Sequence, residues 1–145
     1  MPAMTPADLM KFLDEHFPQA AHLGLAVEHL DDTTIRVRLP ADERHLRPGG
    51  TISGSTLMWL VDCGFYFLLL GRLGPRATLA VTTNLNINFM RKPELAGLLG
   101  EGRLMKLGRS LAVGDFTIWS EGKKEPVAHA TVTYSLPPAG RQKRP

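Results

Sequence analysis

Asp62 is the residue of this sequence best suited to do chemistry, because it is the one charged residue in the apolar run 51–70. If the run is a helix, the neighbours of Asp62 on its own face, three and four positions away, are Met58, Trp59, Phe65 and Tyr66. A carboxylate in apolar surroundings can be tuned to act as a general base or as a nucleophile. The alternative is a structural aspartate that accepts hydrogen bonds from a hydroxyl or from the backbone, and composition does not decide between the two.

The beginning of the same run is rich in small residues. Residues 48–55 read Pro-Gly-Gly-Thr-Ile-Ser-Gly-Ser. Such a segment lets a ligand approach the free backbone N–H groups at the start of a helix, which bind anions or polarise a carbonyl oxygen. It is not a phosphate-binding loop of the nucleotide-hydrolysing type, because no Gly-Lys-Ser/Thr follows. The pattern makes the amides of Gly54 and Ser55 candidate donors, although a glycine-rich start also suits a purely structural helix.

Neither metal nor thiol chemistry is indicated. The five histidines lack metal-ligand spacing, and none has an obvious serine or cysteine partner. The single cysteine, Cys63, excludes an intramolecular disulfide and a cysteine-rich zinc site, and is expected to be a small buried residue. We therefore expect no metal, no cofactor and a cytoplasmic location.

The residues named above must be positioned by one long helix. The apolar run predicts a helix over 53–70, ended by Gly71 and then by Gly74-Pro75. A shorter helix is predicted to begin after Thr5, with Pro6 and Asp8 in its first turn, and to end before Pro18.

The rest of the sequence reads as strands. Residues 23–30 and 33–39 flank a predicted turn at Asp31-Asp32, and 41–51 reads as a loop. Four longer strand candidates follow, with a turn over 121–124 before the last: 78–90, 96–107, 110–119 and 127–136. One short helix cannot cover the apolar helix, so the sheet must curl around it. The expected fold class is α+β, with a single domain over 1–136 and a basic, disordered tail over 137–145.

The charge distribution argues against nucleic acid as a partner. The formal net charge is +3 and the pI is near 9.3, but three of the cations lie in the last nine residues, PPAGRQKRP. The body of the chain is then formally neutral. A membrane span over 51–70 is possible by length, but a carboxylate at mid-bilayer costs about 2.5–3.5 kcal/mol, which favours a buried helix. We expect no nucleic acid and no membrane partner.

Four segments together resemble the hotdog-fold acyl-CoA thioesterases of the phenylacetate-degradation type. They are HLRPGGTISGSTLMWLVDCG, AVTTNLNINFMRKP, LMKLGRSLAVGDFTIWSEG and PVAHATVTYSL, and the resemblance covers about residues 23–136. The family usually has His-Gly-Gly at the helix start and an Asp or Glu nine residues after the histidine. Here Ser53-Gly54-Ser55 replaces His-Gly-Gly, Asp62 stands nine residues after Ser53, and Arg47 replaces an asparagine that many members carry.

The resemblance implies roles for particular residues. The amide of Gly54 or Ser55 would polarise the thioester carbonyl, Asp62 would attack it or activate water, and Thr82 would orient the water. The implied substrate and coenzyme A (CoA) contacts are Arg47, Phe89, Arg91, Lys106, Gly108, Arg109 and Ser110. The aromatic residues of the apolar run are expected in the core or at an interface, with Trp59 or Phe65 as candidate linings of an acyl tunnel.

The spacing of the two catalytic features requires a second chain. Ser55 and Asp62 share a helix face but lie about 10 Å apart along the axis at 1.5 Å per residue. Two antiparallel helices related by a two-fold axis near Met58 or Trp59 would bring the helix start of one chain to Asp62 of the other. The resemblance implies such dimers, often paired into tetramers. The predicted activity is metal-independent hydrolysis of small or medium acyl-CoA thioesters, aromatic acyl groups included; the alternative is a non-catalytic acyl-CoA-binding protein.

Overall fold

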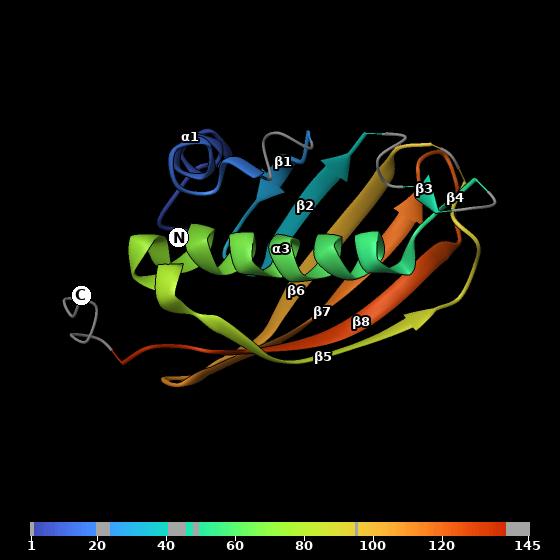
Figure 1. Ribbon diagram of the computed structural model, residues 1–145. Helices are drawn as coiled ribbons and strands as arrows, with labels where there is room; N and C mark the ends of the chain where they lie inside the picture. Colours follow the sequence, from blue (N-terminus) through green and yellow to red (C-terminus); the bar gives the residue numbers. More distant parts are fainter. Residues whose placement is uncertain (1, 20–23, 41–45, 48–49, 95, 139–145) are drawn as a thin grey trace.

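A long helix, α3 (Gly54–Leu73), lies across one face of a six-stranded antiparallel sheet (Figure 1). The computed structural model describes residues 2–19, 24–40, 46–47, 50–94 and 96–138. The strands of this sheet, in spatial order, are β1 (Ala26–Leu30), β2 (Thr34–Leu39), β6 (Leu98–Leu107), β7 (Leu111–Ser120), β8 (Pro126–Ser135) and β5 (Val81–Phe89). The predicted α+β architecture, an antiparallel sheet wrapped around one apolar helix, is confirmed.

Shorter elements flank the helix on both sides. Part of the predicted loop 41–51 forms a small hairpin, in which β3 (Leu46–Arg47) pairs with β4 (Thr51–Ile52). The 3-10 helix η2 (Gly74–Leu79) follows α3 and occupies residues predicted to begin a strand, because Thr78 and Ala80 bond back to carbonyls of the same turn. Residues 139–145 of the predicted tail lie outside the described residues.

Glycines on both the helix and the sheet make room for aromatic rings where the two layers meet. A Cβ on Gly114 of β7 would lie 2.4 Å from the ring of Phe65, and a Cβ on Gly64 of α3 would lie 2.5 Å from the ring of Phe116. Both rings are fully buried. The two aromatic rings therefore fill the space between α3 and the sheet at these positions, and the depth of α3 in the sheet depends on the two glycines.

The predicted end of the long helix is wrong by three residues. The helix continues through Gly71 and ends at Leu73, with Gly74 as its cap at φ +76°. Gly71 is instead a site of close approach, because a Cβ there would lie 2.4 Å from a methyl carbon of Leu30. Gly71 therefore allows close packing against Leu30 and does not end the helix.

The first helix, α1 (Pro6–His16), begins as predicted. The Thr5 hydroxyl accepts from the Asp8 N–H while the Asp8 carboxylate accepts from the Thr5 N–H, which forms a capping box. The helix buries Leu9 and Leu13 and lies beside the C-terminal half of α3 (Figure 1).

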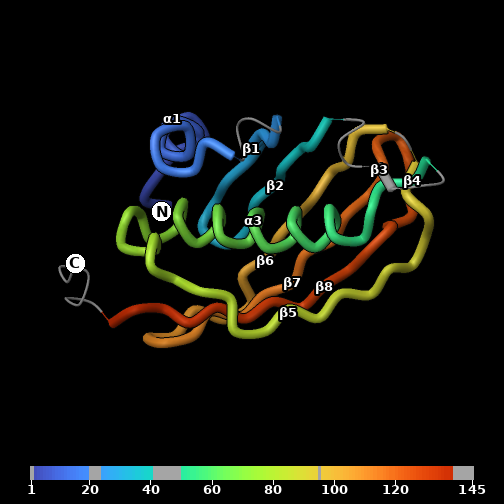
Figure 2. The backbone as a smooth tube through the Cα atoms, viewed as in Figure 1, coloured from blue at the N-terminus to red at the C-terminus, as the bar shows by residue number. Residues whose placement is uncertain are grey.

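Strand β5 forms one edge of the sheet and pairs with β8 alone (Figure 2). The predicted alternation of its side chains is broken near its start, since the register with β8 shifts between Thr82 and Asn84. Thr82 pairs with the inward-facing Tyr134, and this bulge turns its side chain towards α3. Without the bulge Thr82 would share the outer face with Asn84.

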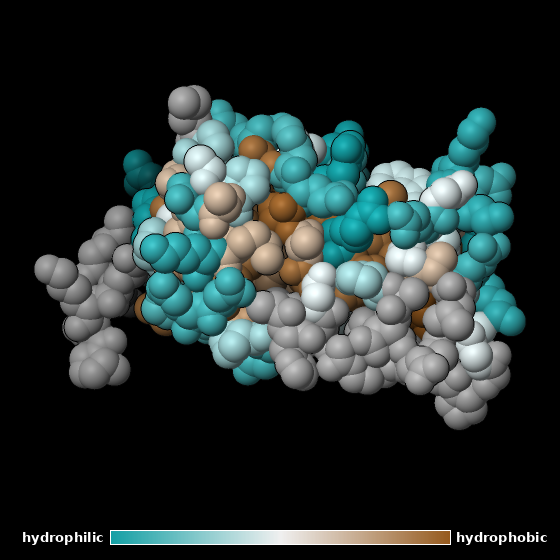
Figure 3. All heavy atoms as spheres, turned by 90° about the horizontal axis from the view of Figure 1, so that it is seen from above, coloured by the Kyte–Doolittle hydropathy of each residue, from teal (hydrophilic) through white to brown (hydrophobic). Residues whose placement is uncertain are grey.

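Helix α3 is long and apolar enough to cross a membrane by length and composition, but 67% of its most apolar window is buried within the protein. A core helix packed on a sheet has this property. Seen from above, hydrophilic side chains cover much of the described surface, and hydrophobic ones emerge near its middle (Figure 3).

Candidate active site

The carboxylate of Asp62 is held by two hydroxyl groups from the sheet. Thr82 of β5 donates to Asp62 Oδ1 at 2.5 Å, and Tyr134 of β8 donates to the same oxygen at 2.6 Å. The Tyr134 hydroxyl also lies 2.9 Å from the backbone carbonyl of Asp62. Asp62 therefore has the hydroxyl donors of a structural aspartate, and its side chain is half-buried and not enclosed in the core. Among the described residues no donor contacts Oδ2, so that oxygen is available to react.

Tyr134 is a functional candidate that the sequence reasoning missed. Its ring is buried, and burial followed by the hydrogen bond to Asp62 raises the pKa of its hydroxyl, so it is a donor at neutral pH. The signal was present in the alternation of β8, where Ala130, Val132 and Tyr134 share the inward face. A tyrosine on an inward face needs a partner for its hydroxyl, and the lone carboxylate of the core helix is the natural one.

The start of α3 offers unpaired backbone amides. Ser53 is the N-cap, and its hydroxyl accepts from the Thr56 N–H at 3.2 Å. The N–H groups of Gly54 and Ser55 have no acceptor within the described part of the chain, as expected for the first turn of a helix. The serine that replaces the histidine of similar sequences is therefore occupied in capping the helix.

Phe89 lies directly over this helix start. A Cβ built on Gly54 would be 3.2 Å from Cζ of Phe89, and the Phe89 ring is 52% exposed. The end of β5 and the beginning of α3 therefore form one surface. A group bound at the Gly54 amide would lie near this ring.

One chain does not bring the amides and the carboxylate together. Gly54 and Asp62 are eight residues apart on a straight helix, which separates them by about 12 Å along the axis. Met58, midway between them, is 42% exposed. The exposed stripe of α3 thus carries the two catalytic candidates at its ends and an apolar side chain between them.

The predicted CoA contacts fall at opposite ends of the molecule. Arg91 follows β5, near the start of α3, and its guanidinium contacts the Glu125 carboxylate at 2.8 Å and the Pro126 carbonyl at 3.0 Å. Lys106 and the turn 108–110 lie at the other end, beside the end of α3 (Figure 1). Arg47 is in β3, and its side chain is outside the described residues.

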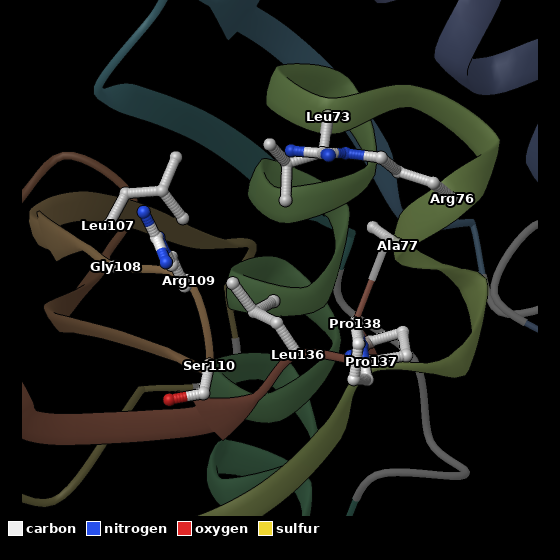
Figure 4. A pocket seen from close by; sticks show the side chains of 10 residues that line it. All are labelled: Leu73, Arg76, Ala77, Leu107, Gly108, Arg109, Ser110, Leu136, Pro137 and Pro138. Atoms are coloured by element: carbon white, nitrogen blue, oxygen red, sulfur yellow. The ribbon is translucent and has the colours of Figure 1, made fainter. Parts of the chain in front are cut away.

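The turn after β6 borders a cavity of about 820 Å³. Gly108, Arg109 and Ser110 line it from one side, and Arg76 and Ala77 of η2 line it from another (Figure 4). Two guanidinium groups at one cavity suit an anionic ligand. Lys106 is exposed but does not line this cavity.

Two other candidates belong to the core. Cys63 is 6% exposed, and burial raises the pKa of its thiol to about 12, with a further contribution from the charge of Asp62. This thiol is therefore protonated and confirms the prediction of a small buried residue. Phe65 is fully buried in the core, whereas Trp59 is half-buried. No cluster of three or more metal-ligating side chains was found in the described residues.

Comparison with known proteins gives a consistent family. The family model described as the thioesterase superfamily matches residues 49–127. A crystal structure from a Silicibacter species, provisionally assigned as a thioesterase, shares 48% identity over 95% of each chain, with a TM-score of 0.87. No curated protein sequence matches the chain significantly.

More distant structures share the fold. A variant of the phenylacetic acid degradation protein of Thermus thermophilus is 26% identical over 83% of this chain and 99% of its own, with a TM-score of 0.72. A thioesterase of Haemophilus influenzae is 19% identical over 98% and 96%, with a TM-score of 0.84. The predicted hotdog fold and the resemblance to the phenylacetate-degradation type are confirmed.

Proposed function

The chain belongs to the thioesterase superfamily, and from this we propose that it hydrolyses small or medium acyl-CoA thioesters to a free acid and CoA. The observation that carries the proposal is the half-buried Asp62 carboxylate, with Oδ1 fixed by two hydroxyls and Oδ2 without a donor among the described residues. A carboxylate fixed in this way is oriented for one reaction geometry without being blocked.

Asp62 acts as a general base in this proposal. Its Oδ2 removes a proton from water while the water oxygen attacks the thioester carbonyl carbon. The carbonyl oxygen becomes an oxyanion, which accepts from the Gly54 or Ser55 amide at a helix N-terminus. The carbon–sulfur bond then breaks, and the CoA thiolate takes the proton from Asp62. Direct attack by the carboxylate is the competing route, and it forms an aspartyl–acyl anhydride with release of the CoA thiolate. Attack of labelled water on the aspartyl carbonyl of this anhydride would place the label in Asp62 during a single turnover, whereas the general-base route labels only the product acid.

The active site is completed by a second copy of the chain. The helix start of one subunit supplies the amide and Phe89, and the other subunit supplies Asp62, Thr82 and Tyr134. The exposed Met58 between them and the open edge of β5 support this arrangement, because both are surfaces that a second copy would cover. The reaction as proposed requires neither a metal nor a cofactor besides the CoA thioester itself.

The CoA phosphates are proposed to lie in the cavity beside Arg109. Arg76 and Arg109 line it together, and CoA carries its negative charge on the nucleotide end. Arg91 does not line this cavity, and its guanidinium contacts Glu125. Replacement of Arg109 by Gln is expected to raise KM for acyl-CoA with little change in kcat, since a phosphate contact binds substrate and transition state alike.

The proposal is tested by thiol release from a panel of acyl-CoA thioesters. Asp62→Asn is expected to lower kcat by about 10²–10⁴-fold, the usual contribution of a general base, while the oligomeric state is retained. The matched control is Asp14→Asn, which changes an exposed carboxylate of α1 in the same way and is expected to leave kcat unchanged. Normal turnover by Asp62→Asn would end the proposal.

A second function is favoured by one observation. Ser53 stands where similar enzymes have a histidine, and its hydroxyl is used to cap α3. A non-catalytic acyl-CoA-binding protein would bind the same thioesters without releasing thiol. Calorimetric binding of acyl-CoA by the wild-type chain, with no thiol release from any thioester, would select this function over hydrolysis.

A further inference from the structure

A second cavity lies on the other side of η2. It has a volume of about 650 Å³ between α1, α3 and η2, and its lining residues are Phe12, Leu13, His16, Phe17, Tyr66, Leu70, Pro75 and Thr78. Apart from His16 at the surface and the Tyr66 hydroxyl, these side chains carry no titratable group. The lining suits a hydrocarbon, whereas the cavity across η2 carries two arginines.

Tyr66 separates this second cavity, called the groove below, from Asp62. It lies one helical turn beyond Asp62 on the same face, about 6 Å along the axis. Its ring stacks on the ring of Tyr134, with centroids 6.1 Å apart and an interplanar angle of 14°. Tyr134 in turn donates to Asp62, so a single aromatic ring stands between the groove and the residues that hold the carboxylate.

The Tyr66 ring is fixed in this position from two directions. Its hydroxyl donates to the carbonyl of Thr78 at 2.9 Å, which ties α3 to η2. The ring of Phe17 lies 6.5 Å away, on the α1 side. Rotation of the Tyr66 side chain would break the hydrogen bond and lose the stacking, so the ring acts as a wall and not as a freely moving side chain.

We propose that Tyr66 sets the maximum length of the acyl group accepted at Asp62, because its ring closes off the groove lined by α1 from the acyl chain. The inference rests on the proposed function, because it concerns the acyl end of the same substrate. It assigns short and medium acyl groups to the wild-type chain, since longer ones meet the Tyr66 ring. Removing the ring joins the groove to the active site and extends the acyl site towards Phe12 and Phe17.

The test measures binding separately from hydrolysis. Non-hydrolysable S-alkyl-CoA thioethers, from ethyl to dodecyl, are titrated by calorimetry into the wild-type protein and into Tyr66→Ala. Affinity of the wild type is expected to stop rising at a medium chain length. Affinity of Tyr66→Ala is expected to keep rising, by about fourfold for each further methylene group buried in the groove. Equal chain-length profiles for the two proteins would overturn the proposal.

Two further variants separate the ring from its hydroxyl and from folding. Tyr66→Phe keeps the ring and should keep the wild-type length limit. The double variant Tyr66→Ala/His16→Trp adds a large ring at the exposed rim of the groove, and should lose the affinity for long chains that Tyr66→Ala gained. If Tyr66→Ala does not fold, Tyr66→Leu replaces it with a residue of helical preference and smaller size.

The outcomes distinguish this proposal from the proposed function. A longer length limit in Tyr66→Ala, with no thiol release by the wild type, would support the acyl groove and reject hydrolysis. Thiol release with an unchanged length limit would support hydrolysis and reject the role of Tyr66. If the wild type binds none of the thioethers, both proposals fail.

Discussion

The hydroxyls of Tyr134 and Thr82 donate to one and the same oxygen of Asp62, at 2.6 and 2.5 Å. The two donors come from adjacent strands, β8 and β5, and pair with each other across the sheet. The sheet therefore fixes the orientation of a carboxylate that the helix carries. In the proposed reaction, the reactivity of Asp62 Oδ2 depends on these two hydrogen bonds to Oδ1.

Loss of the Tyr134 hydroxyl is expected to impair turnover and not binding. Tyr134→Phe should lower kcat by about tenfold or more, since a hydrogen bond to a charged group contributes about 1.5–3 kcal/mol. KM should change little, because the hydroxyl contacts Asp62 and not the substrate. A raised KM with normal kcat would contradict this role.

The oxyanion donor can be removed without removing the helix. Gly54 occupies the first helical position, where proline is favoured, and Ser53 before it is extended at ψ 149°, as a residue before proline should be. Gly54→Pro deletes the N–H and is expected to lower kcat by about 10²–10³-fold. Gly54→Ala adds the same Cβ near Phe89 but keeps the N–H, so it is the matched control. Equal activities of the two variants would assign the carbonyl to the Ser55 amide.

Mixing two inactive variants tests whether the site is shared. In a heterodimer of Asp62→Asn and Gly54→Pro, one of the two sites combines an intact Asp62 with an intact Gly54 amide. Co-refolding equal amounts should therefore restore about a quarter of the wild-type activity if the chains associate at random in a two-fold dimer. The control is each variant refolded alone. No recovery in a mixture that contains heterodimers would place both groups in one subunit and contradict the shared site.

Asp31 is expected to stabilise the fold in a pH-dependent way. Its carboxylate accepts from the Thr34 hydroxyl, contacts His29 Nε2 and accepts from the Thr33 N–H, and these bonds lower the pKa of Asp31. A lowered pKa means that the contribution is present above the unfolded value, about 3.9, and is lost as the pH falls towards the folded one. Asp31→Asn should therefore have a lower urea midpoint than the wild type at pH 7.

The difference between the two proteins should narrow below about pH 4, because the Asp31 carboxylate of the unfolded wild-type chain begins to gain its proton there while that of the folded protein stays charged. Asp14→Asn, at an exposed position, serves as the control. A difference that stays constant from neutral to acid pH would mean that the charge of Asp31 does not stabilise the turn.

Sequence reasoning found the elements whose signals are local. The capping box at Thr5 and the turn at Asp31 follow from side chains that bond to their own backbone neighbours. The long helix and its carboxylate follow from one charge in an apolar run. The contact of Asp62 with Tyr134 could not be found in this way, because the two are 72 residues apart and meet only through sheet packing.

The orientation of Thr82 was hidden for a different reason. Its position was assigned by resemblance, but strict alternation would have placed it on the outer face with Asn84. A bulge inserts one residue into the strand, so the side chains before it point to the opposite face of the sheet. No residue type at this position indicates the bulge in the sequence. The extension of α3 through Gly71 was missed because glycine at a helix end and glycine at a close contact look alike in sequence.

The glycines at the contact between α3 and the sheet have a consequence for how this protein tolerates substitutions. Asp62 is part of the helix, whereas Thr82 and Tyr134 are part of the sheet. The distance between the helix and the sheet therefore sets the lengths of the hydrogen bonds to the Asp62 carboxylate. Any side chain at Gly64 or Gly114 widens that gap. A methyl group added at either glycine does not contact substrate, but it would lengthen these hydrogen bonds. Its effect on activity would then resemble that of a substitution at Asp62. The helix–sheet distance on which the chemistry depends is therefore set by two residues without side chains, Gly64 and Gly114.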